Sequence, residues 1–218
     1  MGAGTDDAGS EDAPVRDEPA SWPVVSSEDL HRDGWVVALR ADRVQRPGAP
    51  EEAPFRRVVL EHPGAAVILA LDAEDRVFCL RQYRHATQMR FVELPAGLLD
   101  VDGESALEVA QRELVEEGAL RAERWTHLVT TYPSPGISAE KAAIFLAEGL
   151  SAADRGEFVL RHEEADMEEL WVPFEDLVDG VLAGRITDAP VVIAVLTLHA
   201  RRTRGVSGGV GPRSGETS

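Results

Sequence analysis

The stretch GLLDVDGESALEVAQRELVEEGAL, residues 97–120, joins a loop to a run of acidic residues. Glu113, Glu116 and Glu117 lie within five positions of one another. Side chains three or four residues apart share one face of a helix, so a helix here would place these carboxylates side by side. Such crowding costs stability unless a cation lies against it, and Mg²⁺ prefers oxygen ligands. The pattern therefore indicates either a metal site or a solvated acidic face, the usual meaning of a charge run in a chain of net charge −17.

Signals around these glutamates predict a helix that begins near Ser105. Ser105 and Glu108 have the spacing of a capping box, and Glu104 would lie favourably at the positive end of the helix dipole. Gly118 suits the end of the helix. The apolar stripe is expected to consist of Leu107, Ala110, Leu114 and Val115. The glutamates then point away from that stripe.

The rest of the chain is predicted to mix strands with helices. Apolar, β-branched runs bounded by Pro and Gly turns predict strands at 35–44, 55–62, 65–72, 77–84, 90–97, 125–132, 141–150 and 169–174. Amphipathic periodicity predicts helices at 173–184 and 188–202, the second with Asp188 as its N-cap. This mixture predicts an α/β sandwich.

Composition limits the classes of partner and environment. The 22 basic residues against 39 acidic ones argue against nucleic-acid binding, which needs a basic surface. The chain has no run of about 18 apolar residues and no secretory signal at its start, so we expect no membrane contact. A single cysteine, Cys79, excludes an internal disulfide framework and favours a reducing, cytoplasmic environment.

Composition also divides the chain. Residues 1–21 are acidic and almost lack large apolar side chains, so we expect disorder there, and likewise in the tail 204–218. Residues 22–62 are expected to form a small β segment. Two strands alone are marginally stable in water, so this segment should pack on something else. Residues 63–203 are expected to form the main α/β domain.

The register of charged residues resembles a known motif. The Nudix box is a Gly, five residues, Glu, seven residues, then Arg-Glu-hydrophobic-x-Glu-Glu-x-Gly-hydrophobic. Glu104 and the run 112–120 match it in register. Gly97 lies one residue too early, and Ala119 stands where the closing glycine is expected, beside Gly118. Neither departure removes a carboxylate, so the resemblance to Nudix hydrolases implies an α/β/α sandwich with a mixed sheet.

The resemblance extends along most of the chain from Phe55 to Arg202. The segments 80–100, 132–138 and 162–177 are similar to the ADP-ribose pyrophosphatase branch, in which a proline lies near the place of Pro135. This implies hydrolysis of ADP-ribose to AMP and ribose 5-phosphate. Two alternatives stay open: another nucleotide sugar or dinucleotide as substrate, or a non-catalytic module that only binds such ligands.

Pyrophosphate hydrolysis explains why the motif needs carboxylates. Divalent ions neutralise charge on phosphoryl oxygens and lower the pKa of the attacking water. Glu113 and Glu117 suit direct contact with Mg²⁺, with Mn²⁺ as an alternative. The family pattern adds Glu116 and the backbone carbonyl of Ala96. It also implies a structural ion pair between Glu104 and Arg112, next to the motif glycine Gly97.

In the resembled branch the general base tends to lie on a loop outside the box. Three glutamates are candidates here: Glu140 in the segment GISAEK, and Glu163 and Glu164 in RHEEADM. Each could equally be a solvated surface glutamate. A general base must lie within hydrogen-bond reach of the water that it deprotonates, and the sequence does not give that distance.

The candidates for substrate binding are scattered. Arg81 and Arg84 could contact phosphate or ribose, since a guanidinium fork matches phosphate oxygens. Trp35, Phe55 and Tyr83 could stack on adenine, with Trp35 and Pro135 counted among the substrate-binding residues. The histidines lack metal-ligand spacing, and one cysteine cannot build a zinc cluster.

The resemblance also implies a partner. In the resembled branch an N-terminal β segment crosses to a second subunit and helps to form the substrate pocket. Residues 22–60 could do this, which predicts a homodimer with two-fold symmetry.

Overall fold

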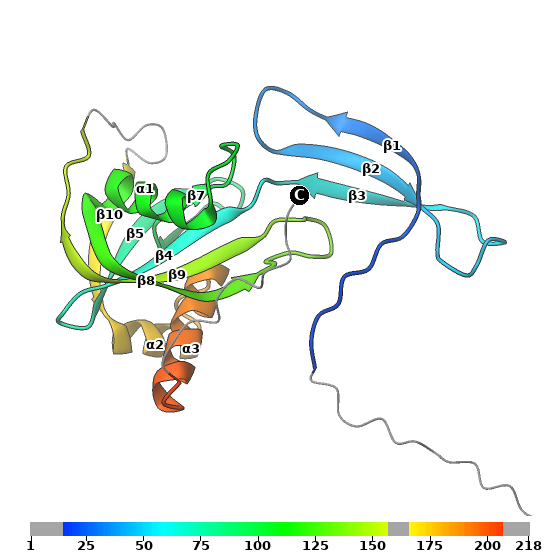
Figure 1. The fold of residues 1–218 in the computed structure, drawn as a ribbon. Coiled ribbons are helices and arrows are strands. Elements are labelled where there is room, and N and C mark those ends of the chain that lie inside the picture. Colours follow the sequence, from blue (N-terminus) through cyan, green and yellow to red (C-terminus); the bar gives the residue numbers. More distant parts are fainter. Residues whose placement is uncertain (1–14, 157–165, 207–218) are drawn as a thin grey trace, which may run out of the picture.

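The computed structural model describes residues 15–156 and 166–206, which form a helix–sheet–helix sandwich joined to a separate three-stranded sheet (Figure 1). The strands of the main sheet are β4 (Ala65–Leu71), β5 (Arg76–Arg84), β6 (Met89–Glu93), β7 (Ala96–Leu98), β8 (Leu120–Thr131), β9 (Ala142–Ala152) and β10 (Glu168–Pro173). The helices are α1 (Ala106–Gly118), α2 (Phe174–Leu182) and α3 (Ala189–Thr203). The predicted α/β/α sandwich is confirmed.

The main sheet is mixed. Its strand order is β10-β5-β4-β9-β8, with β6 beside β5 and β7 beside β4. The pair β4–β9 is parallel, and the other pairs are antiparallel. One strand was predicted over 90–97, but the structure divides it, so that β6 extends the β5 hairpin and β7 crosses to β4. The division falls at Leu94 and Pro95, and proline has no N–H to continue a ladder. The carbonyl of Pro95 still accepts from the N–H of Ile68 at 2.9 Å, so the division stays bonded to β4.

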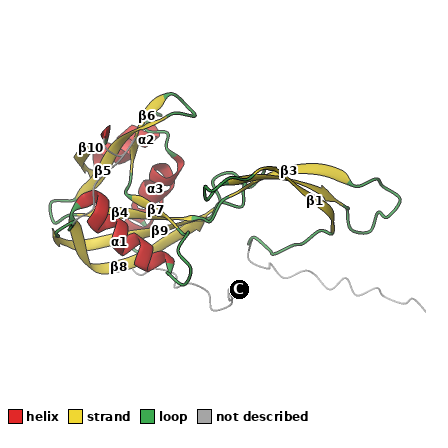
Figure 2. Cartoon of the chain, turned by 90° about the horizontal axis from the view of Figure 1, so that it is seen from above, coloured by secondary structure: helices red, strands yellow, loops and turns green. Residues whose placement is uncertain are grey.

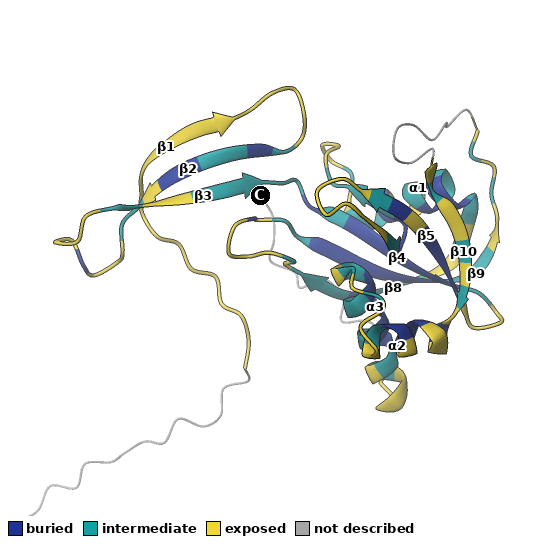
Figure 3. Cartoon of the chain, turned by 180° about the vertical axis from the view of Figure 1, so that it is seen from behind, coloured by how far each residue is buried: buried dark blue, intermediate teal, exposed yellow. Residues whose placement is uncertain are grey.

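Two apolar layers hold the sandwich together, and both are dark blue in Figure 3. Strand β4 shows how one sequence serves both, because successive side chains of a strand face opposite sides. Ala66, Ile68 and Ala70 pack under α1. Val67 and Leu69 face α2 and α3. All five are at most 3% exposed, which explains why β4 reads as an unbroken apolar run.

Helix α1 has the predicted start and a different end. The capping box of Ser105 and Glu108 is confirmed. The helix continues through Gly118 and is capped by Ala119, whose φ of 50° is left-handed. Gly118 instead allows a close approach, since a Cβ there would lie 3.0 Å from the ring of Phe78. In the apolar stripe, Val109 is fully buried and Val115 only half-buried.

The N-terminal sheet consists of β1 (Val24–His31), β2 (Ala38–Val44) and β3 (Phe55–Glu61), in that order. It projects from the sandwich (Figure 2), and the segment after β3 leads directly into β4. Every residue of β1 is exposed. Strand β1 was not predicted, because its polar run SSED gives no apolar alternation.

The remaining expectations about the chain ends fall partly beyond these ranges. Residues 15–21 are exposed and have no regular structure, and residues 1–14 and 207–218 lie outside the described part. Within the described ranges, no helix combines the length and apolar character that crossing a membrane requires.

Candidate functional site

The acidic face of α1 lies against the loop that precedes it. A Cβ on Gly97 would lie 2.1 Å from Oε1 of Glu113, so only glycine leaves room for this carboxylate beside the backbone of β7. The motif glycine therefore works through contact with Glu113, and the extra residue of the loop is absorbed between β7 and Ser105. Sequence spacing alone did not reveal this contact.

Arg112 organises three of the acidic side chains. Its Nε and Nη2 donate to the two carboxylate oxygens of Glu104, each at 3.3 Å, which is the expected ion pair. Its Nη1 also donates to Glu113 at 2.7 Å and to Glu116 at 3.0 Å. One positive charge is thus shared by three negative ones. Although burial opposes it, this surplus of negative charge raises the pKa of Arg112.

Glu117 lies deeper, on the side of the helix that faces β7. It is 9% exposed, and its Oε2 accepts a hydrogen bond from the backbone N–H of Ala96 at 3.0 Å. The carboxylate and the Ala96 backbone are therefore adjacent, as the motif implies. Among the described residues no three acidic, histidine or cysteine side chains converge closely enough to form a ready metal cluster.

The donor set nevertheless fits a hard divalent cation. Glu113, Glu116 and Glu117 offer only oxygen atoms, which suit Mg²⁺ or Mn²⁺ and would not select zinc. Because Gly97 has no Cβ, no side chain stands between its backbone and the Glu113 carboxylate. The single positive charge of Arg112 does not balance the negative charges of Glu113 and Glu116, to which it donates. These residues would hold the ion after Arg112 and the carboxylates adjust.

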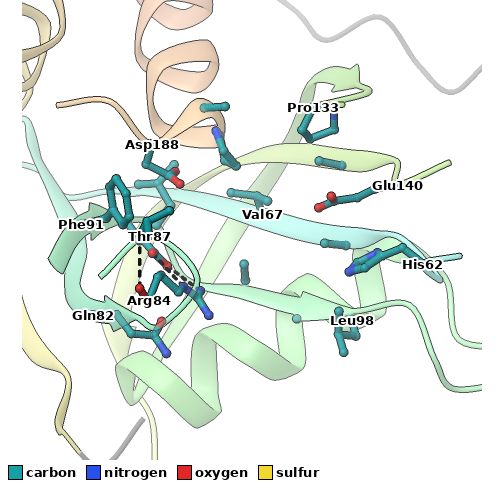
Figure 4. Close-up of a pocket in the computed structure, with 18 of the residues that line it drawn as sticks. His62, Val67, Gln82, Arg84, Thr87, Phe91, Leu98, Pro133, Glu140 and Asp188 are labelled. Atoms are coloured by element: carbon teal, nitrogen blue, oxygen red, sulfur yellow. Dashed lines mark hydrogen bonds and ion pairs between the residues drawn. The ribbon is translucent and has the colours of Figure 1, made fainter. Parts of the chain in front are cut away.

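A pocket of about 740 Å³ opens beside Glu117, where β6 separates from β7. Figure 4 shows it with side chains from distant segments pointing inward. Its acidic members are Glu93, Glu117, Glu140 and Asp188, and its ring-bearing members include Trp35, His62 and Phe91. This volume is in the range of small-molecule sites.

The pocket wall formed by β5, β6 and α3 is charged. Arg84 makes a bidentate pair with the buried Glu93, with Nε–Oε1 at 2.9 Å and Nη2–Oε2 at 2.6 Å. This pairing raises the pKa of Arg84. Asp188 caps α3, as predicted, by accepting from the N–H of Val191 at 3.1 Å. Burial raises the pKa of Asp188 to about 6, and Glu93 acts in the same direction.

The base candidates separate into one that is placed and two that are not. Glu140 lines the pocket, and its backbone N–H donates to Oγ of the buried Ser138 at 3.0 Å, which fixes the local chain. Glu163 and Glu164 lie outside the described residues.

The substrate-binding candidates also separate. Trp35 and Arg84 line the pocket. Arg81 lies outside it and pairs with Glu168 of β10 at 3.0 Å. Pro135 occupies an exposed turn and does not line the pocket. The proline that lines the pocket is Pro133. The alternation of side chains along β5 separates the two arginines. Their positions differ by three, an odd number, so Arg81 and Arg84 face opposite sides of the strand.

The other two aromatic candidates lie away from the pocket. Phe55 packs edge-on against Trp22 at 6.2 Å on the N-terminal sheet. Tyr83 packs against His85 at 6.3 Å. Phe91 is the aromatic residue that the sequence analysis missed, and it faces its register partner Gln82 across the β5–β6 hairpin.

Two other residues of the pocket, His62 and Glu93, were also not predicted to belong to the site. His62 was examined only for metal-ligand spacing, and Glu93 was read as part of a strand. A signal existed for Glu93, because hairpin pairing sets Leu80 opposite it, and Arg84 lies an even number of residues from Leu80, so its long side chain is on the same face of the hairpin as Glu93. For His62 the sequence offers no such signal.

Comparison with known proteins adds to this geometry. A family model described as the NUDIX domain matches residues 60–194. The chain is 42% identical over 179 residues to an ADP-ribose pyrophosphatase of Mycobacterium tuberculosis, covering 82% of this chain and 84% of that protein. It is 32% identical over 166 residues to a methanol dehydrogenase activator of Bacillus methanolicus, covering 76% of this chain and 86% of that protein.

Among solved structures, a crystal structure of an ADP compounds hydrolase superposes with a TM-score of 0.66. The match covers 88% of this chain and all of the other, at 18% identity. At that identity the likeness concerns the fold, and it includes the N-terminal part of the chain as well as the sandwich.

Proposed function

Because this chain belongs to the Nudix family and is a Nudix hydrolase, we propose that it cleaves the pyrophosphate bond of ADP-ribose, with water, to AMP and ribose 5-phosphate. The observation that carries the proposal is the juxtaposition of the acidic face of α1 with the pocket, which share Glu117, Ala96 and Gly97. A relative with 42% identity that is named for this activity supports the choice of substrate.

The acidic helix supplies the charge that the reaction needs. Nudix hydrolases generally use divalent metal ions, and we propose Mg²⁺ held by Glu113, Glu116, Glu117 and the carbonyl of Ala96. Such an ion neutralises charge on phosphoryl oxygens and lowers the pKa of the attacking water. The chain's own part is to hold these ligands in place, through Gly97 under Glu113 and through the Ala96 N–H on Glu117.

The pocket orients the substrate for that attack. Phosphoryl transfer is catalysed mainly by positioning and electrostatics, so the wall that grips the nucleoside and ribose decides which diphosphate is cut. We propose Trp35 as a stacking surface for adenine and Arg84 as a contact to the ribose or phosphates. Arg81 and Pro135 remain weaker candidates, since both lie outside the lining.

We propose Glu140 as the general base. It lines the same pocket as Glu117, whereas Glu163 and Glu164, the other two candidates, lie outside the described residues. A base here would accept a proton from the water as its oxygen bonds to phosphorus and the bridging oxygen leaves.

The test is a turnover assay of purified protein with ADP-ribose, other nucleotide sugars and dinucleotides, with and without Mg²⁺ or Mn²⁺. We expect AMP and ribose 5-phosphate from ADP-ribose and no turnover in EDTA. Binding of ADP-ribose with no AMP formed would favour the alternative of a non-catalytic binding module. Faster cleavage of another diphosphate would support the proposed reaction and show that ADP-ribose is not the preferred substrate.

We also propose that the protein works as a homodimer through the N-terminal sheet, in the cytoplasm. Trp22, Val24, Val25 and Leu30 are 40–60% exposed on or beside β1, so large apolar side chains are available there for a second chain to cover. The sheet projects from the sandwich, so a second copy could cover it (Figure 2). Sedimentation at micromolar concentration should give a dimer, and a monomer would contradict the proposal.

A further inference from the structure

The turn that joins the N-terminal sheet to the sandwich, His62-Pro63-Gly64, places a histidine in the pocket. In Figure 4, His62 and Glu140 reach into the pocket from one side, whereas Arg84, Phe91 and Asp188 lie on the other. No part of the proposed reaction assigns a role to His62, and nothing in its spacing with other residues points to one.

The protonation of His62 follows from a backbone hydrogen bond. The N–H of Gly64 donates to Nδ1 of His62 at 3.1 Å. A ring nitrogen that accepts a hydrogen bond carries no proton, so this bond assigns the ring proton to Nε2. Nε2–H is therefore a donor of fixed identity at the end of the ring that faces away from the turn.

The turn is clamped, so this donor is also fixed in place. Gly64 has φ +100°, and a Cβ there would lie 2.9 Å from the carbonyl of Lys141, so no other residue fits. Its own carbonyl accepts from the N–H of Leu99 at 3.0 Å, in the loop that leads to α1. The N–H of Ala65 donates to the carbonyl of Lys141 at 2.9 Å. His62 is thus tied both to the helix loop and to the segment that carries Glu140.

A second set of hydrogen bonds holds the chain at Leu60, two residues before His62. The N–H of Leu60 donates to the carbonyl of Ile137 at 2.8 Å, and Oγ of Ser138 donates to the carbonyl of Leu60 at 3.2 Å. Since Ser138 also accepts from the N–H of Glu140, the histidine and the glutamate belong to one hydrogen-bonded unit. Preorganised donors of this kind bind anionic groups with little ordering cost.

The charge of the pocket makes a neutral donor useful. Among the described residues that line it, Arg84 is the one arginine or lysine, and Glu93 already binds the Nε–Nη2 edge of its guanidinium. Carboxylates of Glu117, Glu140 and Asp188 face the same space. A substrate with two phosphates therefore meets a negative wall, where an N–H can donate a hydrogen bond to a phosphate oxygen without a further charge to desolvate.

We propose that His62 is a substrate-binding residue whose Nε2–H donates to a phosphate oxygen of the diphosphate bound in the pocket. This rests on the proposed function for the identity of the substrate, and it names the chemistry on the Glu140 side of the site. A hydrogen bond to a charged group contributes about 10-fold to 100-fold in affinity.

Two variants of His62 separate a substrate contact from a role in the turn. In His62→Asn, Oδ1 can take the place of Nδ1 and keep the bond from Gly64, but the side chain is too short to present a donor where Nε2 was. In His62→Gln, the amide reaches the position of Nε2 but not that of Nδ1. His199→Asn, on α3 and outside the pocket lining, is the matched control.

If the proposal holds, His62→Asn lowers kcat/KM for ADP-ribose about 10-fold to 100-fold, His62→Gln recovers part of it, and His199→Asn matches the wild type. The reverse ranking, with His62→Asn at the wild-type value, overturns the proposal. If both variants fall equally, binding of ADP-ribose in EDTA by calorimetry decides: weaker binding by His62→Asn supports a contact, and unchanged binding overturns it.

The same calorimetry distinguishes this proposal from the proposed function. Should the wild type bind ADP-ribose without hydrolysing it, the enzymatic proposal fails while His62 is still tested by binding. Should the wild type hydrolyse it and His62→Asn do so equally well, only the His62 proposal fails. Competition by AMP and by ribose 5-phosphate then identifies the half of the substrate whose phosphate is contacted, and a variant that weakens neither product overturns the contact.

Discussion

The acidic face of α1 and the wall of the pocket are built in opposite ways. The face comes from a single helix whose spacing aligns Glu113, Glu116 and Glu117, and one neighbouring loop completes it. The wall comes from the β1–β2 loop, the β3–β4 turn, the β5–β6 hairpin, the 133–140 segment and the start of α3. A local arrangement can be kept while distant segments change, so the chemistry of the face can be retained when the wall is altered.

Glu140, the proposed general base in the pocket wall, is where this division can be tested by the largest expected effect. Glu140→Gln keeps the size of the side chain and removes its basicity, so kcat for ADP-ribose should fall about 10²–10⁴-fold with KM little changed. The measurement is steady-state kinetics with Mg²⁺. Glu148→Gln, at the far part of β9, is the matched control and should keep wild-type turnover. Wild-type kcat in Glu140→Gln would remove Glu140 and leave Glu163 and Glu164.

Loss of a carboxylate on the helix face should affect every substrate alike. Glu117→Gln keeps an acceptor for the Ala96 N–H but loses the negative charge for a metal, so we expect a fall in kcat/KM of at least about 100-fold. The concentration of Mg²⁺ needed for half-maximal rate should rise as well. The measurement is a Mg²⁺ titration with two different diphosphate substrates.

The matched control for that titration is Glu123→Gln, on an exposed part of β8. If Glu117→Gln lowered turnover of one substrate and spared another, the helix face would itself select substrates, and the contrast between face and wall would be wrong.

The contact between Gly97 and Glu113 sharpens the same comparison by geometry alone. Gly97→Ala changes no charge, yet its Cβ would lie 2.1 Å from Oε1 of Glu113, so the carboxylate must move. Displacement of a catalytic group by about 1 Å can cost about 10²-fold, and we expect a 10-fold to 100-fold loss of kcat/KM with the fold retained. Gly136→Ala is the control without such a contact, since nothing lies within 4 Å of a Cβ there and its backbone is not left-handed. Equal activity of the two variants would contradict the assigned role of Gly97.

Local features of the fold and the site were predictable from the sequence, whereas contacts between distant segments were not. The helix, its capping box and the strands of the sandwich were predictable because their signals are local: spacing, caps and apolar runs. The ion pair of Glu104 and Arg112 was available through its register in the motif. The predicted strand 77–84 already places Arg81 and Arg84 on opposite faces, but which face meets the pocket depends on segments that are distant in the sequence. His62 became visible only when distant segments met, since no short-range pattern marks such a meeting, whereas Glu93 could have been found from the hairpin of β5 and β6.

Asp188 gives the wall a pH-dependent effect on stability. Its pKa is about 6 in the folded protein, above the ordinary value of 3.8, because burial disfavours the ionised form. The folded state therefore holds the proton more tightly than the unfolded state, and stability falls as the pH rises from about 4 to 6. Asp188→Asn keeps an acceptor for Val191 and cannot ionise.

Above pH 6, Asp188→Asn should exceed the wild type in free energy of unfolding by about 1–3 kcal/mol, and below about pH 4 the difference should vanish. Urea unfolding at several pH values measures it, with Asp179→Asn on the exposed side of α2 as the control. A difference that does not change with pH would mean that Asp188 ionises freely in the fold.

The smallest expected effect concerns the end of α1, where two neighbouring residues have exchanged the roles that sequence alone would give them. Ala119 occupies the left-handed cap with φ 50°, a conformation that costs an alanine about 1 kcal/mol more than a glycine. Ala119→Gly relieves that strain but makes the unfolded chain more flexible, so a net gain of about 0.5 kcal/mol is expected. Gly118→Ala should have the opposite sign, because its Cβ would press on Phe78 at 3.0 Å. Thermal unfolding of both variants measures the pair, and a stabilising Gly118→Ala would show that Phe78 has room to yield and that the glycine beside the cap is not required for packing.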